Sequence, residues 1–307
     1  MDSLPLDGFL ALRIIYDDRE NFNTTCGIFE IGYLYLFMRG NMEINYQETT
    51  NDLLKRIDIH KQYGGRDIDR WMLDLLNPKN GSNILDVGCG AGKQCFLYHQ
   101  YTGGTANITG GDVNVELLTK ARSENTKIGN PIRIIELDFN KRFPFEDDLF
   151  DLESCCFAIY YASDIPATIR EMHRVLKPGG RLFSTGPMPE NKQLFYDVIK
   201  EATGKVIPPM PGSSRYSTEI MAAMQETFSS VENHIFENPL TFPEVEPFIE
   251  YTRASLSEDR KLWTSLFNDK EDFSKVMNEI ELIAEKRLKK DANLVMTKVV
   301  GGFVATK

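Results

Sequence analysis

The sequence has few cysteines, no long apolar segment and no recognisable export signal. Its five cysteines are odd in number, include an adjacent pair and show no C-x-x-C spacing, so we predict neither a disulfide framework nor a metal site. The longest apolar stretch, Ile28 to Met38, contains Glu30 and falls well short of the ~20 residues that a membrane span needs. The first residues lack the basic region and cleavage site of a signal peptide. We therefore expect a cytoplasmic chain with reduced thiols and no membrane partner.

The sequence also lacks a dense block of basic residues. Its 35 lysines and arginines are outnumbered by 45 aspartates and glutamates, which gives a net charge of −10 over 307 residues. Broad binding to nucleic acid depends on neutralising phosphates, so this balance argues against it. With 42% hydrophobic and 26% charged residues, the composition is that of an ordinary globular protein with a sizeable core.

Residues 1–41 show no clear helical or strand period, whereas regular patterns begin at Met42. Two interpretations stay open for this segment. It is an arm packed over the domain, or Met42 is the true start and the preceding residues are a translated leader or a disordered extension. Helical patterns then cover residues 50–59 and 66–76, the second of which is capped by Asp67.

From residue 83 onward, short apolar strands alternate with helical patterns. This order is typical of a parallel, doubly wound α/β sheet, which binds ligands at the carboxyl ends of its strands. The predicted strands cover 83–87, 106–113, 131–138, 150–159 and 181–187, and the helices between them cover 93–101, 115–125 and 165–176. Beyond 187 we predict helices over 191–203 and 218–228, a Pro/Gly-rich loop at 207–214, a strand near 231–236, a mostly helical stretch to 291 and a last strand over 293–307.

A glycine loop follows the first predicted strand. Gly88, Gly90 and Gly92 stand between this strand and a helix, where backbone N–H groups are directed at a bound ligand. The dinucleotide fingerprint G-x-G-x-x-G requires a glycine where this chain has Lys93. Asp86, just before the loop, would repel a pyrophosphate but attract an ammonium or sulfonium group. The loop therefore favours a cationic ligand.

Acidic residues also end the next two predicted strands. Asp112 is placed to accept hydrogen bonds from both hydroxyls of a ribose, and Val113 to cover one face of an adenine. Asp138 can accept a hydrogen bond from the amino group of adenine, with Phe139 beside the ring. A helix cap or a loop position would explain each acid alone, but three acids at successive strand ends beside a glycine loop indicate a nucleoside site.

The blocks ILDVGCGAG, GGDV, ELDF, FPFEDDLFDL and REMHRVLKPGGRLFSTGP follow one another between residues 84 and 187. In order and spacing they resemble the class I S-adenosylmethionine-dependent methyltransferases, and the resemblance covers about Tyr63 to Pro187. It implies a Rossmann-like, seven-stranded α/β sheet in which an antiparallel hairpin follows five parallel strands. It also implies a methyltransferase core over 42–242, a helical cap that determines specificity over 243–292 and a last core strand over 293–307.

The same resemblance implies a role for each candidate residue, with S-adenosylmethionine (SAM) as the cofactor and no metal. The methionine part of SAM would lie against Asp86, Gly88, Cys89 and Gly90, the ribose against Asp112, and the adenine against Val113, Asp138 and Phe139. Tyr63 matches an aromatic residue that closes over the methionine end, and Cys155 and Cys156 fall beside the methyl group.

The sequence also contains candidate residues for the acceptor side of the site. Tyr160 and Tyr161 stand where many small-molecule members of the family carry a histidine pair. We predict that these tyrosines orient the acceptor or surround an amine, and packing under the cap is the alternative. His60 and His234 are further candidates for the pocket.

Transfer of a methyl group from an activated sulfonium requires an acceptor held close and in line, and a base only when that acceptor arrives protonated. We therefore predict an enzyme that methylates the N or O atom of a small molecule and acts as a monomer or homodimer. The alternatives are a tRNA or protein methyltransferase and a cofactor-binding pseudoenzyme that regulates a partner.

Overall fold

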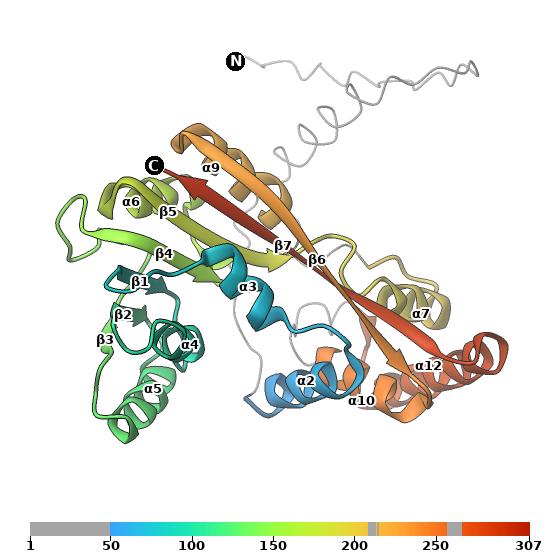
Figure 1. Cartoon of the computed structure of the whole chain (residues 1–307). Coiled ribbons are helices and arrows are strands. Elements are labelled where there is room, and N and C mark those ends of the chain that lie inside the picture. Colours follow the sequence, from blue (N-terminus) through green and yellow to red (C-terminus); the bar gives the residue numbers. More distant parts are fainter. Residues whose placement is uncertain (1–49, 208–212, 214, 257–265) are drawn as a thin grey trace, which may run out of the picture. The chain divides into compact units, whose positions relative to one another are not determined.

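The computed structural model of the chain contains one sheet, with the strand order β3-β2-β1-β4-β5-β7-β6 (Figure 1). The structure describes residues 50–207, 213, 215–256 and 266–307. The predicted extension over 1–41 and most of the loop predicted at 207–214 lie outside the described residues. The strands are β1 (Asn83–Val87), β2 (Asn107–Asp112), β3 (Arg133–Glu136), β4 (Phe150–Cys156), β5 (Leu176–Pro187), β6 (Ser230–Phe242) and β7 (Leu294–Thr306).

The pairing of these strands confirms the predicted fold class. β1 to β5 pair in parallel, and β7 pairs antiparallel with both β5 and β6. The described helices are α2 (Thr50–Tyr63), α3 (Ile68–Leu76), α4 (Lys93–Tyr101), α5 (Val115–Lys127), α6 (Ile165–Val175), α7 (Gln193–Thr203), α9 (Met221–Thr227), α10 (Val245–Leu256) and α12 (Lys270–Asp291), with a 3₁₀ turn η1 (Ile159–Tyr161) and a π turn η2 (Tyr216–Ile220).

Among the strands, β4, β5 and β6 depart furthest from their predicted bounds. β4 ends at Cys156 because Phe157 adopts a left-handed backbone (φ 57°), so the tyrosine pair lies in η1. β5 begins at Leu176, and the turn predicted at 177–180 is a register irregularity within this strand. β6 runs to Phe242, well beyond the predicted 231–236.

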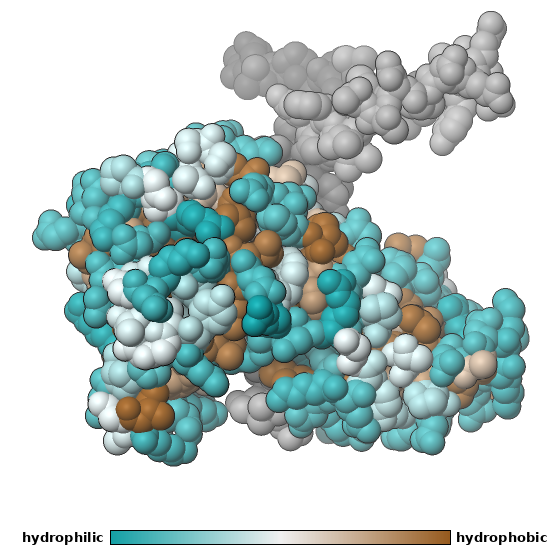
Figure 2. All heavy atoms as spheres, viewed as in Figure 1, coloured by the Kyte–Doolittle hydropathy of each residue, from teal (hydrophilic) through white to brown (hydrophobic). Residues whose placement is uncertain are grey.

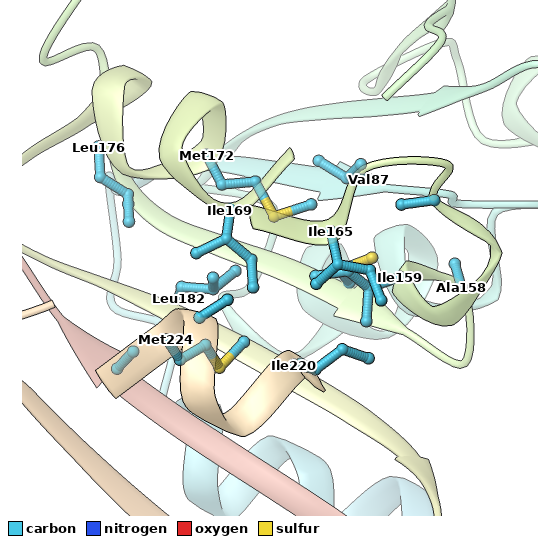
Figure 3. Close-up of a cluster of buried hydrophobic side chains, with 14 of the residues drawn as sticks. Val87, Ala158, Ile159, Ile165, Ile169, Met172, Leu176, Leu182, Ile220 and Met224 are labelled. Atoms are coloured by element: carbon cyan, nitrogen blue, oxygen red, sulfur yellow. The ribbon is translucent and has the colours of Figure 1, made fainter. Parts of the chain in front are cut away.

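Helices cover both faces of the sheet, as strand alternation requires. Leu85 and Val87 of β1 point into a cluster beneath α6 and α9, which Figure 3 shows, whereas Ile84 points into the cluster beneath α3, α4 and α5. Successive residues of a strand face opposite sides, so Asp86 lies on the same side as α4.

A third cluster, which we call the distal cluster, lies around the outer halves of β6 and β7, where Figure 1 shows helices α2, α7, α10 and α12 gathered. Its buried residues include Ile59, Phe195, Ile199, Leu240, Phe242, Phe248, Tyr251, Ile280 and Met296. β7 contributes to all three clusters, through Leu294 and Met296 in the distal cluster, Phe303 and Ala305 beneath α6, and Val304 beneath α3. The cap boundary at residue 243 remains a prediction.

The described surface is mixed in polarity. On the face drawn in Figure 2, hydrophobic side chains reach the surface in small groups between hydrophilic ones. Among the described residues, no helix is both long and apolar enough to cross a bilayer.

Glu153 of β4 is a fully buried carboxyl group whose two oxygens have no hydrogen-bond partner among the described residues. Its neighbours in the sheet are Leu85 and Leu182, both in the cluster beneath α6. Burial, followed by the charge of Glu171, raises the pKa of Glu153 well above its ordinary value of 4.5. Folding therefore favours the neutral form of Glu153. Below pH 4.5 this side chain is neutral in both the folded and the unfolded chain, and as the pH rises above 4.5 the folded protein loses stability.

We expect Glu153→Met to raise the free energy of unfolding by about 1–3 kcal/mol at pH 7, because it removes an unpaired buried polar group. The gain in stability should be larger at pH 8 than at pH 5, because only the parent protein carries a buried acid whose ionisation destabilises the fold. Urea denaturation at both pH values measures this gain, with Glu136→Met, at an exposed position of β3, as the control. Equal or lower stability of Glu153→Met would contradict this account.

Candidate functional site

The glycine loop after β1 is joined by hydrogen bonds to the end of β2. The N–H groups of Gly88 and Cys89 donate to the carbonyl of Gly111, at 2.8 and 3.0 Å. The Gly90 N–H donates to Oδ2 of Asp112 at 2.8 Å. The expectation that these N–H groups are directed at a ligand is therefore wrong, because the chain itself supplies their acceptors.

Asp112 connects two segments of the site. Besides the Gly90 N–H, its carboxylate accepts the N–H of Asn114 through Oδ1, at 2.8 Å. The N-cap of α5 is Asn114, whose own Oδ1 accepts the Leu117 N–H at 3.1 Å. The alternative explanation of Asp112 as a helix cap is therefore wrong. Each carboxylate oxygen accepts a backbone hydrogen and has further acceptor capacity.

Asp86 lies beneath the loop and is only 2% exposed. Its carboxylate accepts hydrogen bonds from the Ser154 hydroxyl at 2.6 Å and the Cys95 thiol at 3.5 Å. Burial raises the pKa of Asp86 to about 6, against the opposing effect of these two donors, and the charge of Asp112 adds to the rise. Asp86 is thus an acid that titrates near pH 6, held inside the protein below the loop.

The three residues predicted beside the adenine follow the ends of β2 and β3. Val113 is 54% exposed, unusually so for an apolar residue at a strand end. Phe139 is partly buried and lies against Gly88, whose missing Cβ would come within 3.9 Å of its ring. Asp138 accepts hydrogen bonds from the backbone and side chain of Asn140 and pairs with Lys141 at 3.1 Å. Burial raises the pKa of Asp138, but these contacts outweigh it and the net shift is downward.

The end of β4 separates the two adjacent cysteines. Cys155 is fully buried beneath α6, whereas Cys156 packs on the opposite face with the α3 and α4 cluster. The structure therefore brings only Cys156 to the side of Asp86. Phe157, which follows, combines a left-handed backbone with a side chain that is 37% exposed, a strained arrangement for a bulky residue.

The remaining predicted residues lie elsewhere. The Tyr160 ring is 8% exposed within the cluster beneath α6, and its ring centroid is 4.6 Å from that of Tyr161. Tyr63 packs on Phe242 in the distal cluster, with ring centroids 5.1 Å apart, and in neither cluster beside the glycine loop. Packing thus accounts for Tyr160 and Tyr63 in this structure, and their roles toward a ligand remain predictions.

The sequence patterns missed two residues of this site. Ser154 meets Asp86 because the two lie side by side in the register of β1 and β4. Strand alternation places Ser154 on the correct face, but only the register identifies its partner. Nothing in the sequence signals the left-handed backbone of Phe157. Within the described part of the chain, no group of three or more His, Cys, Asp or Glu side chains could hold a metal ion.

Comparisons with known proteins assign the chain to a family. A family profile described as "Methyltransferase domain" matches residues 85–184. The ubiquinone/menaquinone biosynthesis C-methyltransferase UbiE of Psychromonas ingrahamii is 31% identical over 178 residues, which are 55% of this chain and 68% of that protein. The chain belongs to the class I SAM-dependent methyltransferases. Its cofactor is accordingly SAM. The UbiE protein of Cronobacter sakazakii is 28% identical over 202 residues, 62% of this chain and 78% of that protein.

Solved structures agree with the methyltransferase fold. The YcgJ protein of Bacillus subtilis superimposes with a TM-score of 0.51 at 17% identity and covers 78% of this chain and 97% of that one. A putative methyltransferase of Bacillus halodurans gives a TM-score of 0.50 at 18% identity, over 78% and 98% of the two chains. At these identities the likeness concerns the fold alone.

Proposed function

We propose that this methyltransferase transfers the methyl group of SAM to a small-molecule acceptor at the carboxyl edge of the parallel strands. One observation carries the proposal. The carboxylate of Asp112 ties the glycine loop to the end of β2, and Asp86 and Asp138 lie at the ends of the two neighbouring strands. Ligands of parallel α/β sheets bind at this edge.

The residues at this edge fit the parts of SAM. Val113 and Phe139 offer partly exposed apolar surfaces suited to an adenine ring, with Asp138 beside them. Asp112 has acceptor capacity for the ribose hydroxyls, and Gly88, Cys89 and Gly90 with the charge of Asp86 would lie along the methionine part. When bound, SAM supplies a methyl group already activated on a sulfonium sulfur. The chain then has to hold the acceptor in line and exclude water.

Two chemistries of the acceptor atom remain to be distinguished. The sequence patterns favour an N or O atom of a small molecule. The names of the UbiE relatives favour carbon, because those proteins are C-methyltransferases of ubiquinone and menaquinone biosynthesis. We keep the small-molecule acceptor as the proposal and carbon as the second candidate for the atom.

Calorimetry with S-adenosylhomocysteine (SAH) is the first test, and we expect saturable binding that also raises the melting temperature. Incubation of the protein and methyl-labelled SAM with a metabolite extract should then yield a labelled small molecule, whose NMR spectrum identifies the methylated atom. Absence of SAH binding at millimolar concentration would overturn the proposal. Binding of SAH with label only in tRNA, only in protein or in no product would favour the alternatives.

The pKa of Asp86 predicts a pH dependence of cofactor binding. SAM is cationic at its sulfonium and ammonium groups, so it should favour the ionised carboxylate. With a pKa near 6, Asp86 ionises largely between pH 5 and pH 7, and affinity for SAM should rise about tenfold over this range. Calorimetric titrations at several pH values measure it. Asp86→Asn should bind more weakly, with a flat profile; the same slope in Asp86→Asn would assign the effect to another group.

A further inference from the structure

Phe157 is a partly exposed aromatic residue with a strained backbone. It directly follows β4, its φ is 57° and its side chain is 37% exposed. A bulky residue rarely adopts this left-handed conformation, because its Cβ comes too close to a neighbouring carbonyl oxygen. Glycine would avoid this cost. Strained residues gather at functional sites, so the retention of a phenylalanine at this position indicates a role for its ring.

Contacts on both sides of Phe157 fix its backbone. Its own N–H donates to the Thr185 carbonyl of β5 at 2.9 Å. The next residue, Ala158, packs against the glycine loop so closely that a Cβ added to Gly88 would lie 2.5 Å from the Cβ of Ala158. A strained conformation persists only where the surrounding structure enforces it, as β5 and the loop do here.

Phe157 also lies where the strand order of the sheet reverses. From β1 the chain continues to β2 and β3 on one side, and it then crosses to β4 on the other side of β1. The connections that follow β1 and β4 therefore leave the sheet in opposite directions, and ligands of parallel α/β sheets bind at such a point. The glycine loop lies on the β1 side of this point, and Phe157 lies on the β4 side.

The proposed placement of SAM directs its reactive end toward β4. In that placement the adenine lies against residues that follow β2 and β3, and the methionine part lies along the glycine loop after β1. The cofactor thus follows the strand order β3, β2, β1, and the next strand in this order is β4. Phe157 is the first residue beyond β4, so we expect its ring beside the acceptor.

The chain around Phe157 offers an acceptor no charge. Residues 155–160 are two cysteines, a phenylalanine, an alanine, an isoleucine and a tyrosine. Burial raises the pKa of Cys155 and of Cys156, so both thiols are neutral at neutral pH. A charged group placed against these side chains would lose its hydration without compensation, whereas an apolar ring would not.

We propose that Phe157 determines the specificity for the methyl acceptor, by contact of its ring with an uncharged, planar and apolar molecule. The proposal rests on the proposed function, since it names the substrate class of the same site. Two aromatic rings attract each other through offset-stacked or edge-to-face contacts, which a saturated ring cannot make. The fixed backbone holds the Phe157 ring in place, so binding orders little that was free before.

The test measures the binding of two probes to the full chain with saturating SAH. 2-Naphthol is planar, and decahydro-2-naphthol has the same skeleton with saturated rings. Calorimetry should show that 2-naphthol binds more tightly than the saturated alcohol. Phe157→Leu keeps the strained backbone and an apolar side chain but removes the ring. It should weaken binding of 2-naphthol about fivefold and that of the saturated alcohol less than twofold.

Two further variants separate binding from stability. Asparagine adopts the left-handed conformation more readily than other residues with a side chain, so Phe157→Asn relieves strain. Its urea midpoint should be no lower than that of the parent, while its binding of 2-naphthol falls about fivefold. Tyr101→Leu removes an exposed ring from the far end of α4 and should change the binding of 2-naphthol less than twofold.

SAH affinity, measured on the same proteins, separates the two proposals. SAH binding together with equal binding of 2-naphthol by the parent and Phe157→Leu would overturn the role of Phe157 and leave the proposed function standing. A lower urea midpoint of Phe157→Asn with unchanged binding of 2-naphthol would likewise assign the ring to the fold. Absence of SAH binding in the parent would overturn the proposed function, while weaker binding of 2-naphthol by Phe157→Leu would still place an apolar site at Phe157.

Discussion

Asp112→Ala should weaken SAH binding by about 10- to 150-fold. If Asp112 accepts the ribose hydroxyls, the substitution removes charge-assisted hydrogen bonds that contribute about 1.5–3 kcal/mol. It also releases the N–H groups of Gly90 and Asn114, so the free energy of unfolding should fall by about 1–2 kcal/mol. Calorimetric titration and urea denaturation of the same variant measure both effects.

Asn114→Ala is the matched control for this prediction. It removes the true N-cap of α5 and should lower stability by about 1 kcal/mol, with SAH affinity within twofold of the parent. A similar loss of stability in the two variants, with SAH affinity unchanged in both, would show that Asp112 acts only within the fold.

Gly88→Ala should lower the free energy of unfolding by about 2–4 kcal/mol. Gly88 has a φ of 72°, which costs an alanine about 1 kcal/mol, and the added Cβ would lie 2.5 Å from the Cβ of Ala158. The shifts that would relieve this overlap add about 1–3 kcal/mol to the loss of stability, because both residues lie in closely packed surroundings. SAH affinity should fall too, since the loop has to move.

Gly81→Ala separates the cost of backbone strain from the cost of the overlap with Ala158. Gly81 has a similar φ of 75°, but an added Cβ would meet no atom within 4 Å. Its loss of stability should therefore be about 1 kcal/mol, from backbone strain alone. Equal losses in the two variants, measured by urea denaturation, would mean that the contact with Ala158 relaxes without cost.

The parallel half of the sheet could be predicted because its signals are local. Period-two and helical patterns alternate from residue 83 to 187, and a glycine or an acid marks the ends of β1, β2 and β3. The length of β6 could not be predicted, because Asn238 and Pro239 lie within it and are typical of turns. β6 is an edge strand, where a proline without an N–H is tolerated, so the strand continues to Phe242.

In the site, too, local features could be predicted from the sequence, whereas contacts between distant residues could not. The glycine loop, Asp112 and Phe139 lie together as their positions at strand ends predict. The pair of Asp86 and Ser154 depends on the register of β1 with β4, which joins residues far apart in the sequence. Strand alternation alone, had the end of β4 been known, would have shown that Cys155 and Cys156 face opposite sides.

The sharing of β7 among all three hydrophobic clusters has a consequence for biosynthesis. β7 follows every other described element of the chain, so during translation none of the clusters can be completed until it has left the ribosome. The nascent chain must therefore hold its apolar faces open until β7 emerges, a period in which chaperones and proteases compete for it. Shortening this last strand would affect the yield of folded protein before it affected any property of the site.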